Sequence, residues 1–261
     1  MTACFCPRCL GDFAEQFGIA GELTPTLVME QHTEQWIEFC CQTWAQLAGV
    51  YREGLRMAVP DGEMYAYSGY QTPRARELYC IDWSIMRDFC DVASAGYGWN
   101  GQVIADTVAA LDGVPLLGGE AYYQPPRNPN LKVDYLQHLL AGCRGVMHYQ
   151  WAPMDGLDYT RIAEAASLVA DHEAFFLEGR RADERVQGVP ERVRFALERD
   201  GELLAIIVNP SSVDETHTLA IAGATGAVTE YHTGRTFADP AQVQITVPAH
   251  DARALVVRLA Q

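Results

Sequence analysis

The stretch from residue 115 to residue 123 (PLLGGEAYY) holds the side chains best suited to chemistry. Its two leucines predict the end of a buried strand, after which Gly118 and Gly119 let the backbone turn tightly or approach a ligand. Glu120 follows at the predicted strand exit, ahead of an aromatic loop that contains Tyr122. A carboxylate in this position could attack an anomeric carbon while aromatic rings cover the apolar face of a sugar. Because the motif is short, a surface glutamate after an ordinary strand is the alternative.

Cys4, Cys6 and Cys9 form a C-x-C-x2-C cluster. Three thiolates this close in sequence suit a soft, tetrahedral ion such as zinc, although a closed structural site needs a fourth ligand and none is obvious nearby. The alternative is a set of small buried thiols. The remaining cysteines lie in apolar settings and are interpreted as buried free thiols of a reducing cytoplasm. They are Cys40, Cys41, Cys80, Cys90 and Cys143.

Four strand-like segments, each followed by a helix-like segment, would position Glu120. The predicted strands cover residues 62–70, 90–98, 114–122 and 145–151, and the predicted helices cover residues 72–89, 101–111, 131–143 and 159–176. Strands that alternate with helices form βα units and a parallel sheet. Polar and aromatic residues at every strand exit are typical of a (β/α)8 barrel, whose sites lie at that face. With four strands rather than eight, the expected fold is a partial TIM barrel, the second half of the whole.

The segments on either side of the βα units have a different character. Residues 33–57 predict a helix whose apolar stripe, from Trp36 through Trp44 to Tyr51, is expected to pack in the core. Residues 180–190 are charged and predict a linker. Six short β-rich runs with turn signals between them follow, at residues 193–197, 203–209, 216–221, 227–231, 243–247 and 254–259. They predict a small antiparallel β-sandwich. The predicted domains are therefore residues 1–182 and residues 183–261.

Aromatic residues near the predicted strand exits are candidates for contact with a sugar, or else plug the top of the barrel. They are Tyr67, Tyr97, Trp99, Tyr122 and Trp151. Tyr67 and Tyr70 are also the candidate hydrogen-bond donors, either of which would keep Glu120 ionised.

Composition narrows the class of partner. The chain has 261 residues, 49% of them hydrophobic, which is enough for a substantial core. A formal net charge of −15 argues against nucleic acid or an anionic membrane as the main partner and is compatible with a neutral substrate. The sequence contains neither an apolar run long enough to span a bilayer nor a signal-peptide pattern, so a cytoplasmic protein is expected.

With the C-x-C-x2-C cluster, Gly-Gly-Glu120 and His148-Tyr-Gln-Trp151 in this order, the chain resembles clan A glycoside hydrolases, and family 42 β-galactosidases in particular. The resemblance covers roughly residues 1–178. It implies retaining hydrolysis of a carbohydrate, with Glu120 as the nucleophile and Trp151 as the floor of the sugar site. It also implies that the three cysteines of the cluster are zinc ligands, with the family's fourth ligand upstream of residue 1.

The resemblance places the general acid just before Met1, and no residue of this chain matches it. The chain is therefore expected to be a fragment of a longer enzyme, or to complete its half-barrel with a second copy in a homo-oligomer or with another chain. The alternative function is a non-catalytic carbohydrate-binding or assembly module on the same scaffold. A third is a structural zinc module whose half-barrel only mediates assembly.

Overall fold

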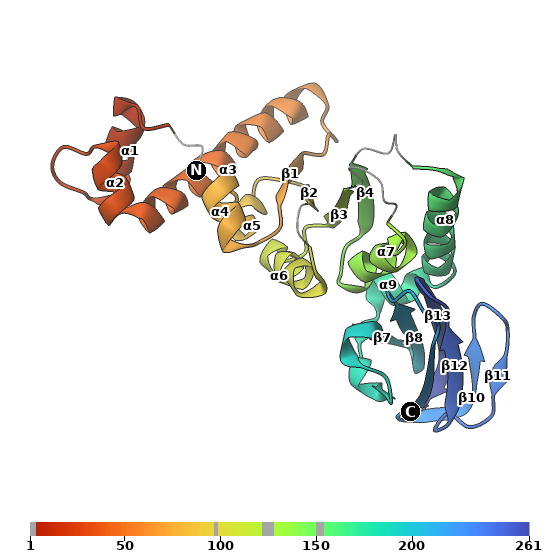
Figure 1. Ribbon diagram of the computed structural model, residues 1–261. Coiled ribbons are helices and arrows are strands. Elements are labelled where there is room, and N and C mark those ends of the chain that lie inside the picture. Colours follow the sequence, from red (N-terminus) through yellow and green to blue (C-terminus); the bar gives the residue numbers. More distant parts are fainter. Residues whose placement is uncertain (1–3, 97–98, 122–127, 150–153, 261) are drawn as a thin grey trace. The chain divides into compact units, whose positions relative to one another are not determined.

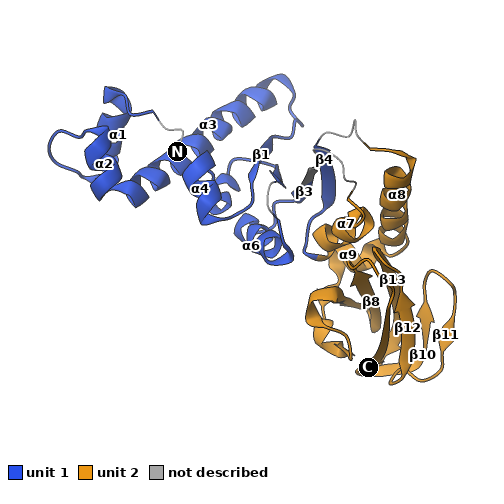
Figure 2. Ribbon diagram, in the orientation of Figure 1, with its two compact units in different colours: residues 1–121, 141–149 blue, residues 122–140, 150–261 orange. Residues whose placement is uncertain are grey.

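The computed structural model describes residues 4–96, 99–121, 128–149 and 154–260. The chain forms two compact units, which Figure 2 shows in different colours. The first unit holds residues 1–121 and 141–149, and the second holds residues 122–140 and 150–261. The predicted division between residues 182 and 183 stays a prediction.

Three helices open the first unit: α1 (Pro7–Phe17), α2 (Pro25–Gln31) and α3 (Thr33–Ala58). A proline in the first turn of α1 and of α2 suits a helix start, because the missing amide would have no partner inside the helix. Phe13, Val28 and Trp36 of these helices are fully buried in one core. The long helix is thus confirmed, almost at its predicted bounds.

The expected burial of the whole stripe on α3 is wrong. Trp36 is fully buried, but Trp44 and Tyr51 are 49% and 62% exposed. The second half of α3 turns small residues toward the core instead, including Ala45 and Ala48. Small side chains let the helix backbone approach its neighbours closely, so the bulky residues of the second half are left on the outside.

The first unit also contains a parallel sheet, whose strands lie in the order β1-β2-β3-β4 (Figure 1). The strands are β1 (Tyr65–Gly69), β2 (Val92–Gly96), β3 (Leu116–Ala121) and β4 (Gly145–Tyr149). The helices between them in this unit are α4 (Pro73–Tyr79), α5 (Trp83–Met86) and α6 (Gly101–Leu111). All four predicted strands are present. The helix predicted over residues 72–89 is broken, because Cys80 takes a left-handed conformation (φ 52°) and Asp82 caps a new helix.

One face of the parallel sheet packs against the helices. Ala93, Ala95 and Leu116 lie on this face and share a core with Trp83 of α5 and Ile104 of α6. Side chains alternate along a strand, and in-register neighbours share a face. The other face therefore holds the intervening residues.

The second face of the sheet carries Tyr67, Ser94, Met147 and Tyr149. The Ser94 hydroxyl lies 3.7 Å from the Met147 sulfur, which confirms that the two share this face. Tyr67 and Tyr149 are each 46% exposed. The alternation thus places Tyr149 on the open face and His148 on the helix side.

The second unit combines helices with two antiparallel sheets. Its helices are α7 (Leu131–Leu140), α8 (Gly156–Asp171) and α9 (Glu173–Glu178). The larger sheet has the order β11-β10-β13-β8-β7-β5 and the smaller one β12-β9-β6. The strands are β5 (Arg180–Arg181), β6 (Val186–Gln187), β7 (Arg194–Arg199), β8 (Glu202–Asn209), β9 (Glu215–Ile221), β10 (Ala224–Glu230), β11 (Thr236–Phe237), β12 (Val243–Val247) and β13 (Asp251–Leu259). The six predicted β-rich runs correspond to six of these strands.

The linker expected over residues 180–190 is instead built into the sheets. β5 pairs with β7, and β6 pairs with β9. Val186 and Val189 are buried in the core despite the charged residues around them. Two apolar side chains in a short charged stretch give too weak a period-two pattern to predict a strand. These residues form strands because they pair with the longer strands β7 and β9.

A single core joins the helices of the second unit to its sheets. Leu136 of α7 and Leu168 of α8 belong to the same buried cluster as Leu204 of the larger sheet and Leu219 of the smaller one. Each Å² of apolar surface that such a core removes from water contributes about 25 cal/mol to the free energy of folding. The sheets and these helices therefore stabilise one another.

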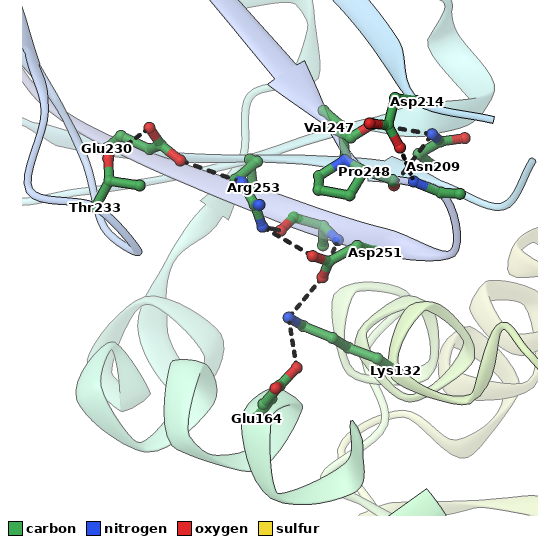
Figure 3. Close-up of polar contacts among 12 residues, drawn as sticks. Lys132, Glu164, Asn209, Asp214, Glu230, Thr233, Val247, Pro248, Asp251 and Arg253 are labelled. Atoms are coloured by element: carbon green, nitrogen blue, oxygen red, sulfur yellow. Dashed lines mark hydrogen bonds and ion pairs between the residues drawn. The ribbon is translucent and has the colours of Figure 1, made fainter. Parts of the chain in front are cut away.

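A row of alternating charges runs beside this core (Figure 3). The side chain of Lys132 on α7 is only 4% exposed, and its Nζ lies 2.6 Å from Asp251 Oδ1 and 3.0 Å from Glu164 Oε2. Arg253 continues the row, with Nη1 2.9 Å from Asp251 Oδ2 and Nε 3.2 Å from Glu230 Oε1. We call these five residues the charge ladder. It ties α7 and α8 to β10 and β13.

The ladder also sets the protonation of Asp251. Burial alone would raise its pKa, but the hydrogen bond from Lys132, the Ala252 amide and the charge of Arg253 together hold the pKa of Asp251 below its usual range.

Within the described ranges, no helix combines the length and apolar character needed to cross a membrane.

Replacing Lys132 by Met should lower the free energy of unfolding by about 3 kcal/mol at pH 7, because the largely buried carboxylate of Asp251 loses one of its two cationic partners. A carboxyl group whose folded pKa is lowered contributes stability above its unfolded pKa of about 4, and loses it as the pH falls through the folded value. The difference between the two proteins should therefore shrink as the pH falls from about 5 to about 3. Urea denaturation at several pH values measures it.

Arg258→Met is the matched control, because Arg258 is 82% exposed and lies 3.8 Å from Glu202. An exposed pair contributes little. Equal unfolding energies for the two variants would contradict a stabilising role for the ladder.

Candidate functional site

The exit of β3 is the centre of the candidate site. The backbone places Glu120 one residue before the end of this strand, in register with His148 of β4. β3 is flanked by β2 on one side and by β4 on the other, so its exit lies between two neighbouring strand ends. In a parallel sheet the carboxyl ends of the strands share one edge, which is where ligands bind in α/β folds.

Two glycines let the neighbouring strand come close to this exit. A Cβ on Gly119 would lie 2.9 Å from both the Ala95 oxygen and the Gly96 Cα, so only glycine fits there. A Cβ on Gly96 would lie 3.1 Å from the hydroxyl oxygen of Tyr67. The Tyr67 ring on β1 therefore reaches across β2, with its hydroxyl over Gly96 and toward the residue that precedes Glu120.

The other aromatic candidates divide into two groups. Trp99 is partly buried and packs against the core of the first unit. Tyr97, Tyr122 and Trp151 lie outside the described residues. Of the five rings, Tyr67 reaches toward the β3 exit. Trp99 instead packs against the core, next in sequence to the residue that caps α6. That cap is Asn100, whose Oδ1 accepts a hydrogen bond of 2.9 Å from the Val103 amide.

Two residues at the end of β4 extend the site beyond the sequence candidates. Tyr149 lies on the open face that carries Tyr67, and His148 lies on the helix side beside Glu120 in register. Burial lowers the pKa of His148, so the ring is neutral at physiological pH. The period-two alternation of residues 145–149 predicts that His148 and Tyr149 lie on opposite faces of the sheet. The sequence alone did not tell which of the two faces the helices; the packing in the structure did.

The carboxylates near the start of the sheet have structural partners. Asp91 accepts a hydrogen bond of 2.8 Å from the Met64 amide and pairs with Arg56 at 2.7 Å. Asp82 caps α5 and pairs with Arg76 at 2.9 Å. Glu63 accepts a hydrogen bond from the Tyr65 hydroxyl. These contacts give all three carboxylates structural roles.

The cysteine cluster forms a second candidate site. The sulfur atoms of Cys4, Cys6 and Cys9 all lie within 4.8 Å of one another. Phe5 stacks on Trp36 of α3 with ring centroids 4.7 Å apart, which fixes the segment that carries the first two thiols. The Cys9 sulfur lies on the first turn of α1, 3.5 Å from that of Cys6. Local stacking and a helix start therefore gather the three sulfurs.

The surroundings favour a thiolate in the cluster. The Cys9 backbone amide, followed by hydrogen bonds with the Cys4 and Cys9 side chains, lowers the pKa of Cys6 to about 7. The hydrogen bond to Cys6, followed by burial, raises the pKa of Cys9 to about 11. The Cys6 thiolate thus accepts hydrogen bonds from the neighbouring thiols, which keep their protons. A metal ion that binds all three sulfurs would displace these protons.

These residues fit three ligands of a soft metal ion such as zinc. Cys4 and Cys9 also line a small groove with Trp36, whose indole Nε1 is buried and has no hydrogen-bond partner among the described residues. An N–H group of this kind suits a thiolate sulfur. Within the described residues, no fourth His, Cys, Asp or Glu joins the cluster. All five other cysteines are buried and free, as predicted.

No protein-family profile matches the chain, and no curated protein matches it significantly. Solved structures do match it. The β-galactosidase from Bacillus circulans sp. alkalophilus superposes with a TM-score of 0.65 at 9% identity, covering 98% of this chain and 78% of that one. A GH30 endoxylanase from Clostridium papyrosolvens C71 superposes with a TM-score of 0.50 at 15% identity, covering 76% of this chain.

The chain spans 56% of the length of this xylanase. Both proteins are glycoside hydrolases by name, so the chain has a fold of the kind that glycoside hydrolases use. At these identities the likeness concerns the fold alone, and it does not single out family 42.

Cobalt(II), which reports sulfur ligation by its absorption, should bind the chain through the cysteine cluster. Cys6→Ser should weaken cobalt binding by more than about 100-fold. Removing a residue that only hydrogen-bonds to a metal ligand lowers metal affinity by about 10- to 100-fold, and removing a ligand itself should lower it further. Affinity should also fall as the pH drops below about 7, where the Cys6 thiolate takes up a proton. Cys90→Ala, which removes a buried thiol outside the cluster, is the control. Equal cobalt spectra for the two variants would rule the cluster out.

Proposed function

We propose that the chain is the C-terminal half of a retaining glycoside hydrolase of the β-galactosidase type, with Glu120 as the nucleophile. The observation that carries the proposal is the position of Glu120 at the carboxyl end of a central parallel strand, in a fold of the glycoside hydrolase kind. Sites of α/β barrels lie at this end of the strands. The activity is assigned from the residue and its place, and the fold alone would not carry it.

In the proposed reaction, the Glu120 carboxylate attacks the anomeric carbon and forms a glycosyl ester. The bond to the leaving oxygen breaks as a general acid protonates that oxygen, and water then cleaves the ester with the same group acting as base. The acid must lie about 5–5.5 Å from the nucleophile. It comes from outside this chain. Tyr67 is proposed to contact the carbohydrate, because its hydroxyl reaches toward the β3 exit.

Aromatic rings would complete the substrate site. Trp151 forms the floor of the sugar site, and Tyr122, Tyr97 and Trp99 contribute further contact with the carbohydrate. Zinc held by Cys4, Cys6 and Cys9 would have a structural role if a fourth ligand from outside the described residues closes the site, because a closed site stabilises a small helical segment and leaves no open position for a substrate.

The proposal includes a partner that completes the barrel. β1 and β4 are the two edges of the described sheet, because each has one neighbouring strand among the described strands, and an edge strand can pair with a further strand. Tyr65 on β1 is 55% exposed, and the outer half of α3 is uncovered as well. The partner is the missing N-terminal half of the barrel or a second copy of the chain.

The alternative proposal is a non-catalytic carbohydrate-binding or assembly module. The partners of three carboxylates of the first unit favour this alternative. Asp82, Asp91 and Glu63 each bind a structural partner, so none of them is available as the general acid. A module of this kind keeps the scaffold without the acid. A reaction that needs no acid separates the two proposals.

The chain alone should form a stable ester with 2-deoxy-2-fluoro-β-galactosyl fluoride. Fluoride leaves without protonation, and the fluorine at C2 slows hydrolysis of the ester because it destabilises the oxocarbenium-like transition state. Peptide mass spectrometry should find the sugar on Glu120. Glu120→Gln should abolish the label, whereas Glu63→Gln should keep it. An unlabelled Glu120, both in the chain alone and with a completing half-barrel, would favour the non-catalytic module.

The chain alone should self-associate, because open parallel edges and the uncovered face of α3 are exposed to solvent. Light scattering should show a mass above that of one chain. Co-expression with a half-barrel of four strands should suppress the self-association. A monomer that melts cooperatively would contradict the need for a partner.

A further inference from the structure

A polar groove lies within the second unit, beside the charge ladder. Its volume is about 640 Å³, within the range of small-molecule sites. One wall is the exposed side of α8, and the other is formed by β13 and the residues that follow β10. The lining residues are Lys132, Thr160, Ala163, Glu164, Ser167, Tyr231, His232, Asp251 and Arg253. Small side chains on α8, such as Ala163 and Ser167, leave the space open.

The floor of the groove retains unused hydrogen-bonding capacity. Lys132 uses two of its donors on Asp251 and Glu164. Arg253 uses Nε and Nη1, and no described residue accepts a hydrogen bond from its Nη2. Among the described contacts, the second carboxylate oxygen of Glu164 is also unused. The groove thus offers both donors and acceptors at fixed positions.

The walls are rigid and partly aromatic. The Tyr231 hydroxyl donates a hydrogen bond to Asp171 on α8. The Tyr231 ring packs edge-on against His172 at 5.0 Å and against His232 at 5.1 Å. A ring held on several sides gives a fixed surface at little entropic cost on binding.

The charges of the groove select the kind of ligand. In the lining, the carboxylates of Glu164 and Asp251 balance the cations Lys132 and Arg253. Two carboxylates outside the lining contact it and make the surroundings negative: Glu230 pairs with Arg253, and Asp171 accepts a hydrogen bond from Tyr231. An anion would therefore meet repulsion, and an apolar ligand would leave the ladder without water. A neutral ligand rich in hydroxyl groups satisfies both donors and acceptors.

We propose that this groove is a carbohydrate-binding site, formed wholly by the second unit and separate from the exit of β3. Hydroxyl groups of a neutral oligosaccharide accept from Arg253 and Lys132 and donate to Glu164, while Tyr231 and His232 contact the sugar ring. The site holds a saccharide without cleaving it. Its existence does not depend on the role proposed for Glu120.

The test uses the full chain and three neutral probes: galactotriose, xylotriose and maltotriose. The histidine ring signals of the chain, labelled with ¹³C-histidine, report directly on the groove through His232, which a His232→Gln spectrum assigns. At least one trisaccharide should shift the His232 signal in a saturable manner. Ala163→Trp should fill the groove and weaken this binding by about tenfold or more, because the added ring occupies the space of the sugar.

Ala166→Trp is the matched control, because Ala166 is also exposed on α8 and does not line the groove. It should bind as the unmodified chain does. Should Ala163→Trp fail to fold, Ser167→Trp tests the same space. The proposal is overturned if no trisaccharide shifts the His232 signal, if both tryptophan variants at 163 and 166 bind equally, or if inorganic phosphate binds there in place of the sugars.

The result is separable from that for the β3 exit. Ala163→Trp should still form the ester on Glu120, and Glu120→Gln should still bind the trisaccharide in the groove. Loss of groove binding in Glu120→Gln would show that the sugar binds at the β3 exit and would overturn the proposal.

Discussion

The ammonium group of Lys132 governs how the second unit is put together. Burying a lysine costs several kcal/mol unless carboxylates surround it. Its two carboxylates come from different elements, Glu164 on α8 and Asp251 at the start of β13. α7, α8 and the larger sheet must therefore assemble together before this charge is satisfied. This requirement explains why helices that the sequence assigns to βα units share a compact unit and a core with the antiparallel sheets.

Close backbone approach plays the corresponding role in the first unit. Gly96 and Gly119 leave no room for a side chain between β2 and β3, so the two strands come together at their exits. The space over Gly96 is taken by the hydroxyl of Tyr67 from the next strand. The geometry at the β3 exit thus depends on the absence of a side chain at Gly96 and Gly119. A larger side chain at either position would push apart the elements that surround Glu120.

Local signals in the sequence predicted most of the elements, and long-range packing decided the rest. Residues 101–111 and 243–247 form a helix and a strand at their predicted bounds, because periodicity and turn residues define them locally. The outer half of α3 was mispredicted because alanines, not Trp44, face the core. At the candidate sites, spacing found Glu120 and the three cysteines. The reach of Tyr67 over Gly96 and the stacking of Phe5 on Trp36 join distant segments, so no local pattern contained them.

Closing the sheet and supplying an acid are a single requirement in the proposed mechanism. Retaining hydrolysis needs a second carboxyl group about 5–5.5 Å from the first. Asp82 and Asp91, two carboxylates of the first unit that precede β2 in the sequence, are held by arginines and backbone amides. A strand that pairs in parallel with the free edge of β1 would end beside Tyr67, at the same edge of the sheet as Glu120. One added strand would therefore extend the sheet beyond β1 and bring its own terminal side chain to the edge of the sheet that holds Glu120, so that the stability of the sheet and the chemistry at its strand exits depend on the same contact.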